Sequence, residues 1–259
     1  MRHSRFPAAV TALCLAFFYV PILILVVNSF NSSRFSTVWG GFSLVWYERL
    51  IHDRAVWLAL RNTLIVALGA TGGSVLIGTM AAFALHRYRS RLQDYHYALI
   101  YTPLVMPEIL MGMSLLLFFV AVGIPLGLAT ITLAHITFCA SYVAMVVLAR
   151  LQDFDFTIVE AAQDLGAGWR TIIWRILLPL LAPGIVAGGL LAFTLSVDDF
   201  VITFFVSGPG STTLPIRIYS MIKHGSPPMI NALSTILLAL TLTVAYATQR
   251  LIGKAEVKR

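Results

Sequence analysis

The chain has 259 residues, of which 59% are hydrophobic and only 11% are charged. A soluble domain carries about 25% charged residues, so this composition excludes a soluble enzyme and predicts one integral membrane domain, 1–259. The net charge of +7 comes from basic residues that are spread over short segments. Such a spread is typical of positively charged cytoplasmic loops and does not favour nucleic-acid binding.

Six long apolar runs predict an all-α polytopic membrane protein with six transmembrane helices. The first run is longer than the core of a signal peptide, so we expect it to be a retained span. If the N-terminus lies inside, the inner segments hold twelve Lys and Arg residues and the outer segments six, which predicts that both termini are cytoplasmic. The predicted spans are 8–30, 60–86, 97–122, 128–150, 180–206 and 229–250, with a cytoplasmic segment at 151–179.

The second predicted span carries small residues four positions apart, at Gly69 and Gly73 and again at Ser74 and Gly78. This spacing lets two helix backbones approach closely and indicates packing against a neighbouring helix. No nucleotide-binding, nucleophile or metal motif occurs in the chain. We therefore expect no catalytic residue, no metal site and no cofactor bound by this chain.

The cytoplasmic segment is an amphipathic insert between two spans. Thr157 and Glu160 have the spacing of a capping box, which predicts the start of a short helix. Gly166 fits the position after the end of that helix, where a positive φ is needed. A second helix is expected over 169–178, ending at Pro179. The result would be a helix, a turn and a second helix, which suit the groove of a partner protein.

The same segment resembles a known family. Glu160-Ala161-Ala162, three residues, Gly166, nine residues, Ile176, one residue and Leu178-Pro179 resemble the E-A-A-x3-G-x9-I-x-L-P signature of binding-protein-dependent ABC importer permeases. The resemblance implies the type I (MetI-like) ABC importer permease fold. It also implies that this segment is the coupling helix that docks on a cytoplasmic ATPase. The expected coupling residues are Glu160, Ala161, Ala162, Asp164, Gly166, Ile176, Leu178 and Pro179.

Further segments resemble the spermidine/putrescine importer permeases, in particular the second of their two permease subunits. They are 21–35, Trp46-Tyr47, 135–139, 193–196, Asp198-Asp199 and 231–233. This likeness implies an importer of polyamines in the inner membrane of a bacterium. The implied partners are a second permease subunit in a heterodimer, two ATPase subunits that hold ATP and Mg, and a periplasmic polyamine-binding protein. ATP binding would close the ATPase pair and move the coupling helices, so that the spans alternate between outward- and inward-facing states.

Carboxylates inside the predicted spans are candidates for the substrate path, because a charge in a membrane is costly and is usually functional. A structural ion pair or a helix cap is the alternative role. Glu108 is expected near the middle of the third span, and Asp198 and Asp199 in the outer half of the fifth. At most one of the two aspartates is expected to face the path, and the other to pair with Arg217 or with a partner subunit. His135 is expected to make an interhelical hydrogen bond and not to be a ligand.

A series of carboxylates suits a chain of protonated amines, and aromatic faces would add cation–π contacts. The aromatic candidates are Tyr19, Trp46, Tyr101 and Phe193, for which interfacial anchoring or helix packing is the alternative role. The glycine-rich outer loop at 207–210 is either a docking point for the binding protein or a plain loop.

Two other functions stay open at this point. One is an importer of the same fold for another cationic or amino-acid-like solute. The other is an ion-coupled secondary transporter that uses Glu108 and Asp198 as a proton relay, although the chain shows no internal repeat that would favour it.

Overall fold

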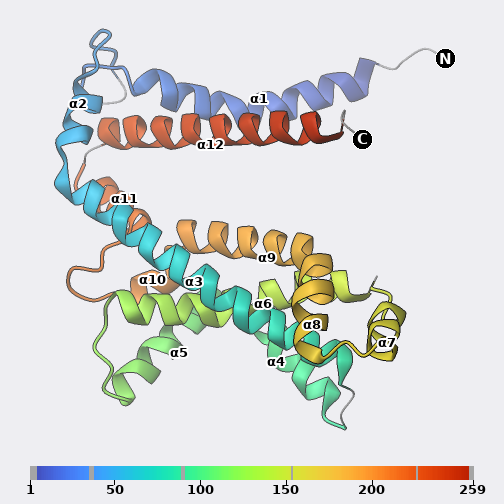
Figure 1. The fold of residues 1–259 in the computed structure, drawn as a ribbon. Helices are drawn as coiled ribbons and strands as arrows, with labels where there is room; N and C mark the ends of the chain where they lie inside the picture. Colours follow the sequence, from blue (N-terminus) through green and yellow to red (C-terminus); the bar gives the residue numbers. More distant parts are fainter. Residues whose placement is uncertain (1–4, 35–37, 89–90, 153, 226, 257–259) are drawn as a thin grey trace. The chain divides into compact units, whose positions relative to one another are not determined.

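The computed structural model describes residues 5–34, 38–88, 91–152, 154–225 and 227–256 (Figure 1). Within these residues the chain is helical, and β structure is limited to an isolated bridge between Asn31 and Phe42. The helices group into two compact units, one formed by Met1–Val56 with Arg217–Arg259 and the other by Trp57–Ile216. The helices are α1 Arg5–Asn28, α2 Val45–His52, α3 Arg54–Arg87, α4 Gln93–Val105, α5 Glu108–Ala121, α6 Leu128–Gln152, α7 Thr157–Asp164, α8 Trp169–Ile172, the π-helical turn η1 Ile173–Leu177, α9 Leu178–Asp198, α10 Val201–Val206, α11 Leu214–Lys223 and α12 Pro227–Glu256.

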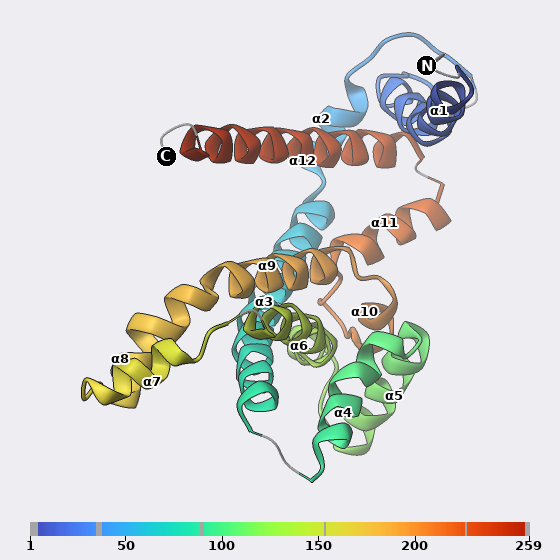
Figure 2. The ribbon, with the colours of Figure 1, turned by 90° about the vertical axis from the view of Figure 1, so that its right-hand side faces the viewer.

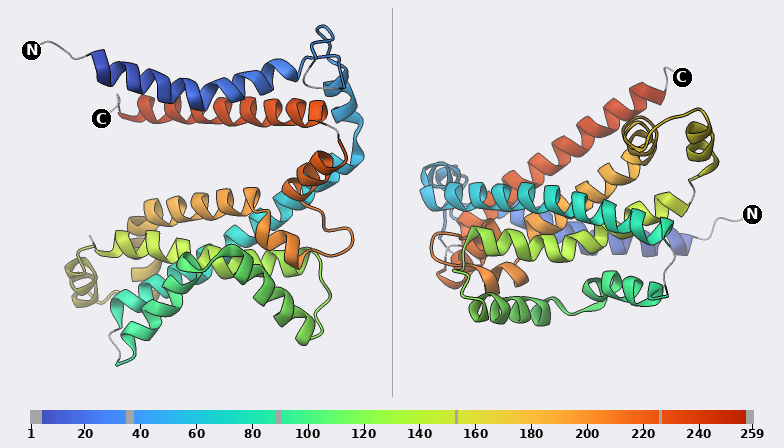
Figure 3. Two further views of the ribbon diagram at one scale, coloured as in Figure 1. Left: turned by 180° about the vertical axis from the view of Figure 1, so that it is seen from behind. Right: turned by 60° about the horizontal axis from the view of Figure 1, so that its bottom comes forward.

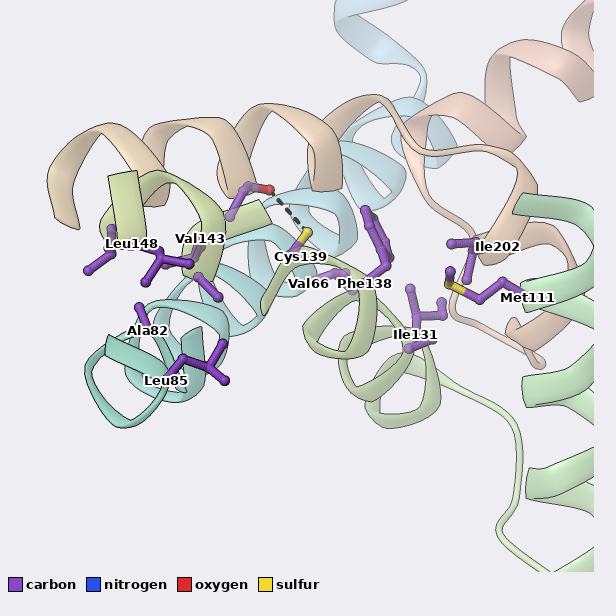
Figure 4. Close-up of a cluster of buried hydrophobic side chains, with 14 of the residues drawn as sticks. Val66, Ala82, Leu85, Met111, Ile131, Phe138, Cys139, Val143, Leu148 and Ile202 are labelled. Atoms are coloured by element: carbon purple, nitrogen blue, oxygen red, sulfur yellow. Dashed lines mark hydrogen bonds between the residues drawn. The ribbon is translucent and has the colours of Figure 1, made fainter. Parts of the chain in front are cut away.

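Helix α6 is the centre of the larger unit. It packs along α9 and also contacts α4, α5 and α10, and Figure 2 shows it between α3, α9 and α10. Apolar side chains occupy every face of α6, and a helix that is apolar all round is expected to be buried. Its buried apolar residues include Ile131, Phe138, Cys139, Val143 and Leu148, which line the core drawn in Figure 4.

Small residues bring α3 and α9 close to α6. A Cβ atom added at Gly78 would lie 2.7 Å from the carbonyl oxygen of Ala140, and one at Gly184 would lie 3.0 Å from the Cβ atom of Arg150. The Ser74 hydroxyl donates to the carbonyl oxygen of Ile136 at 3.4 Å. The predicted packing role of the small residues on the second span is therefore confirmed.

The predicted third span, 97–122, is not one helix. It divides into α4 and α5, which meet at an angle of 108° and form the bent pair visible in Figure 3. Met106 adopts the extended backbone that a following proline favours, and Pro107 has no N–H to continue the α4 hydrogen bonds. Pro103, by contrast, lies inside α4 without breaking it.

The smaller unit contains α1 packed against α12 and α2 packed against α12. Its loop after α1 is built on Asn31, whose side chain donates to Val38 and accepts from the backbone N–H of Gly40. Asp53 forms an ion pair with Arg217, in which Nη2 of Arg217 lies 3.1 Å from Oδ2 of Asp53. The predicted alternative of an Arg217 pair with Asp198 or Asp199 is therefore wrong.

Among the described residues, four helices are long and apolar enough to cross a membrane, or five if the bent pair counts as one. The four are 9–28, Arg54–Arg87, Leu128–Gln152 and the continuous helix Trp169–Asp198. Within the described part of α12, the apolar helix Pro228–Thr243 is shorter. Six spans and cytoplasmic termini therefore stay predictions.

Candidate coupling site and substrate path

The predicted cytoplasmic helix is present as α7, and a small apolar cluster holds it in place. Val159 of α7 packs with Ile172 and Leu177, and all three are buried. Ala162 and Ile176 of the signature pack against this cluster, half-buried. The other expected coupling residues on α7, which are Glu160, Ala161 and Asp164, are exposed. The signature thus supplies both the anchored side and the exposed side of one short helix.

The end of α7 follows the prediction. Gly166 has φ +81°, in the left-handed region that favours glycine. The Gly166 N–H donates to Gln163 at 2.8 Å and the Ala167 N–H to Ala162 at 2.9 Å. These two bonds form a Schellman motif, which satisfies carbonyl groups at the helix end.

The start of α7 does not follow the prediction. Thr157 is the first helical residue and not the cap, and no side-chain cap bond is made at the position before it. The backbone N–H of Thr157 donates instead to the carboxylate of Asp155 at 2.9 Å. That hydrogen bond, supported by the Thr157 hydroxyl, lowers the pKa of Asp155 below its ordinary value. The capping box was wrong because Asp155, two residues earlier, satisfies this N–H first.

The second predicted helix does not end at Pro179. It runs on through α8, η1 and α9 as one continuous helix, Trp169–Asp198. Inside η1 the Leu178 N–H bonds to the carbonyl of Ile173, five residues back. A π-helical turn widens the helix just where Pro179 lacks its N–H and its ring would meet the preceding turn. The proline is therefore accommodated inside the helix.

A cavity of about 480 Å³ separates α7 from the end of α3 and from the first turns of the continuous helix. The His86 ring stacks on Phe156 at 5.2 Å between centroids. No motif in the sequence predicts this cavity, because its walls come from three separate segments. It is lined by Phe83, His86, Arg87, Phe156, Val159, Glu160, Gln163, Trp169 and Leu177.

Large apolar side chains are exposed around the turn after α7. Leu165 is 90% exposed and Trp169 is about half exposed, and Ile158 at the start of α7 is also about half exposed. Soluble proteins normally bury large apolar side chains. Their exposure beside the glycine turn therefore indicates an interaction surface.

Glu108 lies at the break in the third span. It is the first residue of α5, directly after Pro107, and its side chain is exposed. The next turn of α5 packs on α10: a Cβ atom at Gly112 would lie 2.7 Å from the ring of Phe205, and Met111 lies beside Ile202 in Figure 4.

A second break separates α9 from α10. Asp198 ends α9, and Asp199 has an extended backbone. The Asp199 carboxylate accepts the Thr203 N–H at 2.8 Å and the Thr203 hydroxyl at 2.7 Å, and its Oδ2 lies 3.2 Å from Nε2 of His135. The Asp199 side chain is only 6% exposed. Asp198 is exposed and has no salt bridge in the described part of the chain.

The structure therefore distinguishes the two aspartates. Asp199 is bound into a buried network around His135, which confirms that His135 makes interhelical hydrogen bonds. Asp198 is the carboxylate that remains accessible at this break.

The aromatic candidates fall in both units. Tyr19 on α1 and Tyr101 on α4 are exposed, and Phe193 on α9 is half-buried. Trp46 is 5% exposed, its indole N–H donates to the Asn31 carbonyl at 2.7 Å, and the Arg49 guanidinium lies 4.8 Å from its ring centroid. These contacts give Trp46 a structural role between α2 and the loop after α1, and its place on a substrate path stays a prediction.

The sequence and the fold both match known proteins. A family model described as "Binding-protein-dependent transport system inner membrane component" matches residues 74–255. The "Spermidine/putrescine transport system permease protein PotC" of Escherichia coli (strain K12) is 44% identical over 243 residues, covering 94% of this chain and 92% of the relative. The "Putrescine transport system permease protein PotI" of the same organism is 45% identical over 264 residues, covering 99% and 94%.

A solved structure is similar over almost the whole chain. It is the crystal structure of a bacterial ABC transporter involved in the import of the acidic polysaccharide alginate, with a TM-score of 0.76 over 96% of this chain and 98% of that chain. The sequence identity is 16%, so this likeness bears on the fold alone.

Proposed function

Because this chain belongs to the family of binding-protein-dependent transport system inner membrane components, we propose that it is the permease subunit of an ATP-driven importer of polyamines. The observation that carries the substrate class is the 44% and 45% identity, over nearly the whole chain, to relatives named for spermidine and putrescine transport. Substrate would reach it from a periplasmic binding protein.

Family membership bears directly on four predictions. The resemblance to ABC importer permeases is confirmed, and so is the corresponding all-α fold class. The chain is a transport subunit and not an enzyme, as the sequence predicted. An ion-coupled secondary transporter loses its support, because the matched family depends on a binding protein.

The wider assembly is part of the proposal. We place the chain in the cytoplasmic membrane of a bacterium, beside a second permease subunit. Two ATPase subunits hold ATP and Mg, and one of them receives α7. The exposed Leu165, Trp169 and Glu160 around the Gly166 turn support this docking, because they form an apolar surface with a charged neighbour on a firmly anchored helix.

The substrate path is proposed to use carboxylates at the two helix breaks. Glu108 and Asp198 are both exposed, and each lies where a membrane-spanning segment is interrupted. Backbone carbonyl groups released at such breaks are tolerated when they line a polar cavity. A polyamine is a flexible cation, so separate carboxylates along a path suit it better than a single deep site would.

Uptake by the assembled importer tests this function. We would reconstitute the chain with its partner permease, ATPase and binding protein in proteoliposomes and measure ATP-dependent uptake of radiolabelled putrescine. Competition by unlabelled spermidine, but not by arginine, is expected. ATP-dependent uptake of arginine without uptake of either polyamine would replace the polyamine assignment with another cationic solute. Uptake that needs a proton gradient and no ATPase would overturn the ABC importer itself.

A further inference from the structure

His135 joins three elements of the larger unit at one point. Its Nδ1 atom lies 2.7 Å from the Ser196 hydroxyl on α9. Its Nε2 atom lies 2.9 Å from the Thr203 hydroxyl on α10 and 3.2 Å from the Asp199 carboxylate between these helices. The side chain is 1% exposed and comes from the central helix α6.

The donors and acceptors of this network determine the role of the imidazole. The Thr203 hydroxyl donates to Asp199, so its oxygen is left to accept from Nε2 of His135. Nε2 of His135 therefore carries the hydrogen, and its N–H donates to both the Thr203 hydroxyl and the Asp199 carboxylate. The Asp199 carboxylate in turn accepts hydrogen bonds from the N–H groups of Ile202 and Thr203. These N–H groups lie at the start of α10, where a helix offers them no carbonyl partner of its own.

Helix α10 is held to α6 at its other end by a separate contact. The Thr130 hydroxyl donates to the Val206 carbonyl at 2.8 Å, and both groups are buried. The start of α10 thus depends on His135 and its end on Thr130. Only the first of these contacts adjoins Asp198, which is the last residue of α9.

We propose that His135 is a positioning residue for substrate recognition, fixing the elbow between α9 and α10 and thereby the direction in which Asp198 presents its carboxylate. The inference rests on the proposed polyamine function and on the assignment of Asp198 to the path. His135 itself does not touch the substrate. It anchors Ser196, Asp199 and Thr203 to one rigid helix, so the elbow cannot open or rewind without breaking buried hydrogen bonds.

The test uses the assembled importer and compares variants at the two ends of α10. We expect H135L to raise KM for putrescine uptake by about tenfold, the usual size of a lost buried hydrogen bond to a charged group. H135Q keeps a donor of similar reach and is expected to recover part of this loss. T130V removes the contact at the far end of α10, together with the bonds of the Thr130 hydroxyl to Gly127, and is expected to leave KM unchanged. Immunoblots of the membrane fraction normalise each variant for assembly.

A double variant separates positioning from a general structural effect. If His135 acts through Asp198, H135Q has no further effect on KM once D198N is present. A rise in KM that is equal in the D198N and wild-type backgrounds would overturn the inference, and so would an equal rise caused by T130V. If H135L does not assemble, the KM values of H135Q, T130V and D198N are sufficient to test the inference. Wild-type KM for D198N would also overturn it, whereas uptake of putrescine by the unaltered importer would still support the proposed function.

Discussion

Gly166 offers a sharp test of coupling, because its replacement changes the backbone of one turn and little else. A Cβ atom at this position would meet nothing within 4 Å, so a larger side chain causes no collision. The effect of a substitution must come from φ +81°, which β-branched residues avoid most strongly. G166V therefore strains the turn, whereas G166N is the matched control because asparagine tolerates this conformation.

The expected size follows from the Schellman motif. A left-handed conformation costs an L-residue about 1–2 kcal/mol, which is similar to the net contribution of the two hydrogen bonds made by the N–H groups of Gly166 and Ala167. Such a cost shifts the equilibrium between the native turn and its alternatives by roughly tenfold. We expect G166V to lower the putrescine imported per ATP hydrolysed by up to about tenfold.

Coupling is measured as the ratio of uptake to ATP hydrolysis in proteoliposomes, after the amount of inserted chain has been matched by immunoblot. G166V should insert normally, since the buried cluster of Val159, Ile172 and Leu177 is untouched. Wild-type coupling in G166V, or an equal loss in G166N, would refute the conformational argument.

Further substitutions test the rest of the description. G78L should cost about 1–3 kcal/mol of packing and reduce the inserted protein, because a Cβ there meets the backbone of α6 at 2.7 Å; G72L, which faces open space, is its control in the same immunoblot. D199N should lower the melting temperature of the solubilised importer, since it disrupts a buried network, while D198N should lower uptake without this loss. P107A should allow α4 and α5 to straighten and reduce uptake; unchanged uptake would argue against a role for the bend.

Local chemistry made several parts of this structure predictable from the sequence. Apolar length located the long helices, the spacing of Gly78 and its neighbours predicted the close approach of a neighbouring helix, and Gly166 predicted the left-handed helix end. In each case the signal lies in a short stretch of sequence. The coupling signature was identifiable for the same reason.

The remaining features depend on competition or on distant residues. The Asp155 carboxylate accepts the hydrogen bond of the Thr157 N–H, and Thr157 is the first helical residue instead of the cap. A π-helical turn accommodates Pro179 inside the helix. Neither outcome follows from a single motif. The separation of Asp198 from Asp199 depends on His135, more than sixty residues earlier in the chain, so spacing alone could not predict which carboxylate is buried.

The continuity of the helix Trp169–Asp198 has a mechanical consequence. Its 30 residues correspond to about 45 Å of continuous helix, with one end beside the Gly166 turn and the other at the elbow that carries Asp198. No loop between these ends could absorb a movement of one end by changing its own conformation. In the proposed importer, a displacement of the end beside the Gly166 turn therefore moves the Asp198 carboxylate in the same step. The release of a bound cation would then coincide with the conformational change of the ATPase.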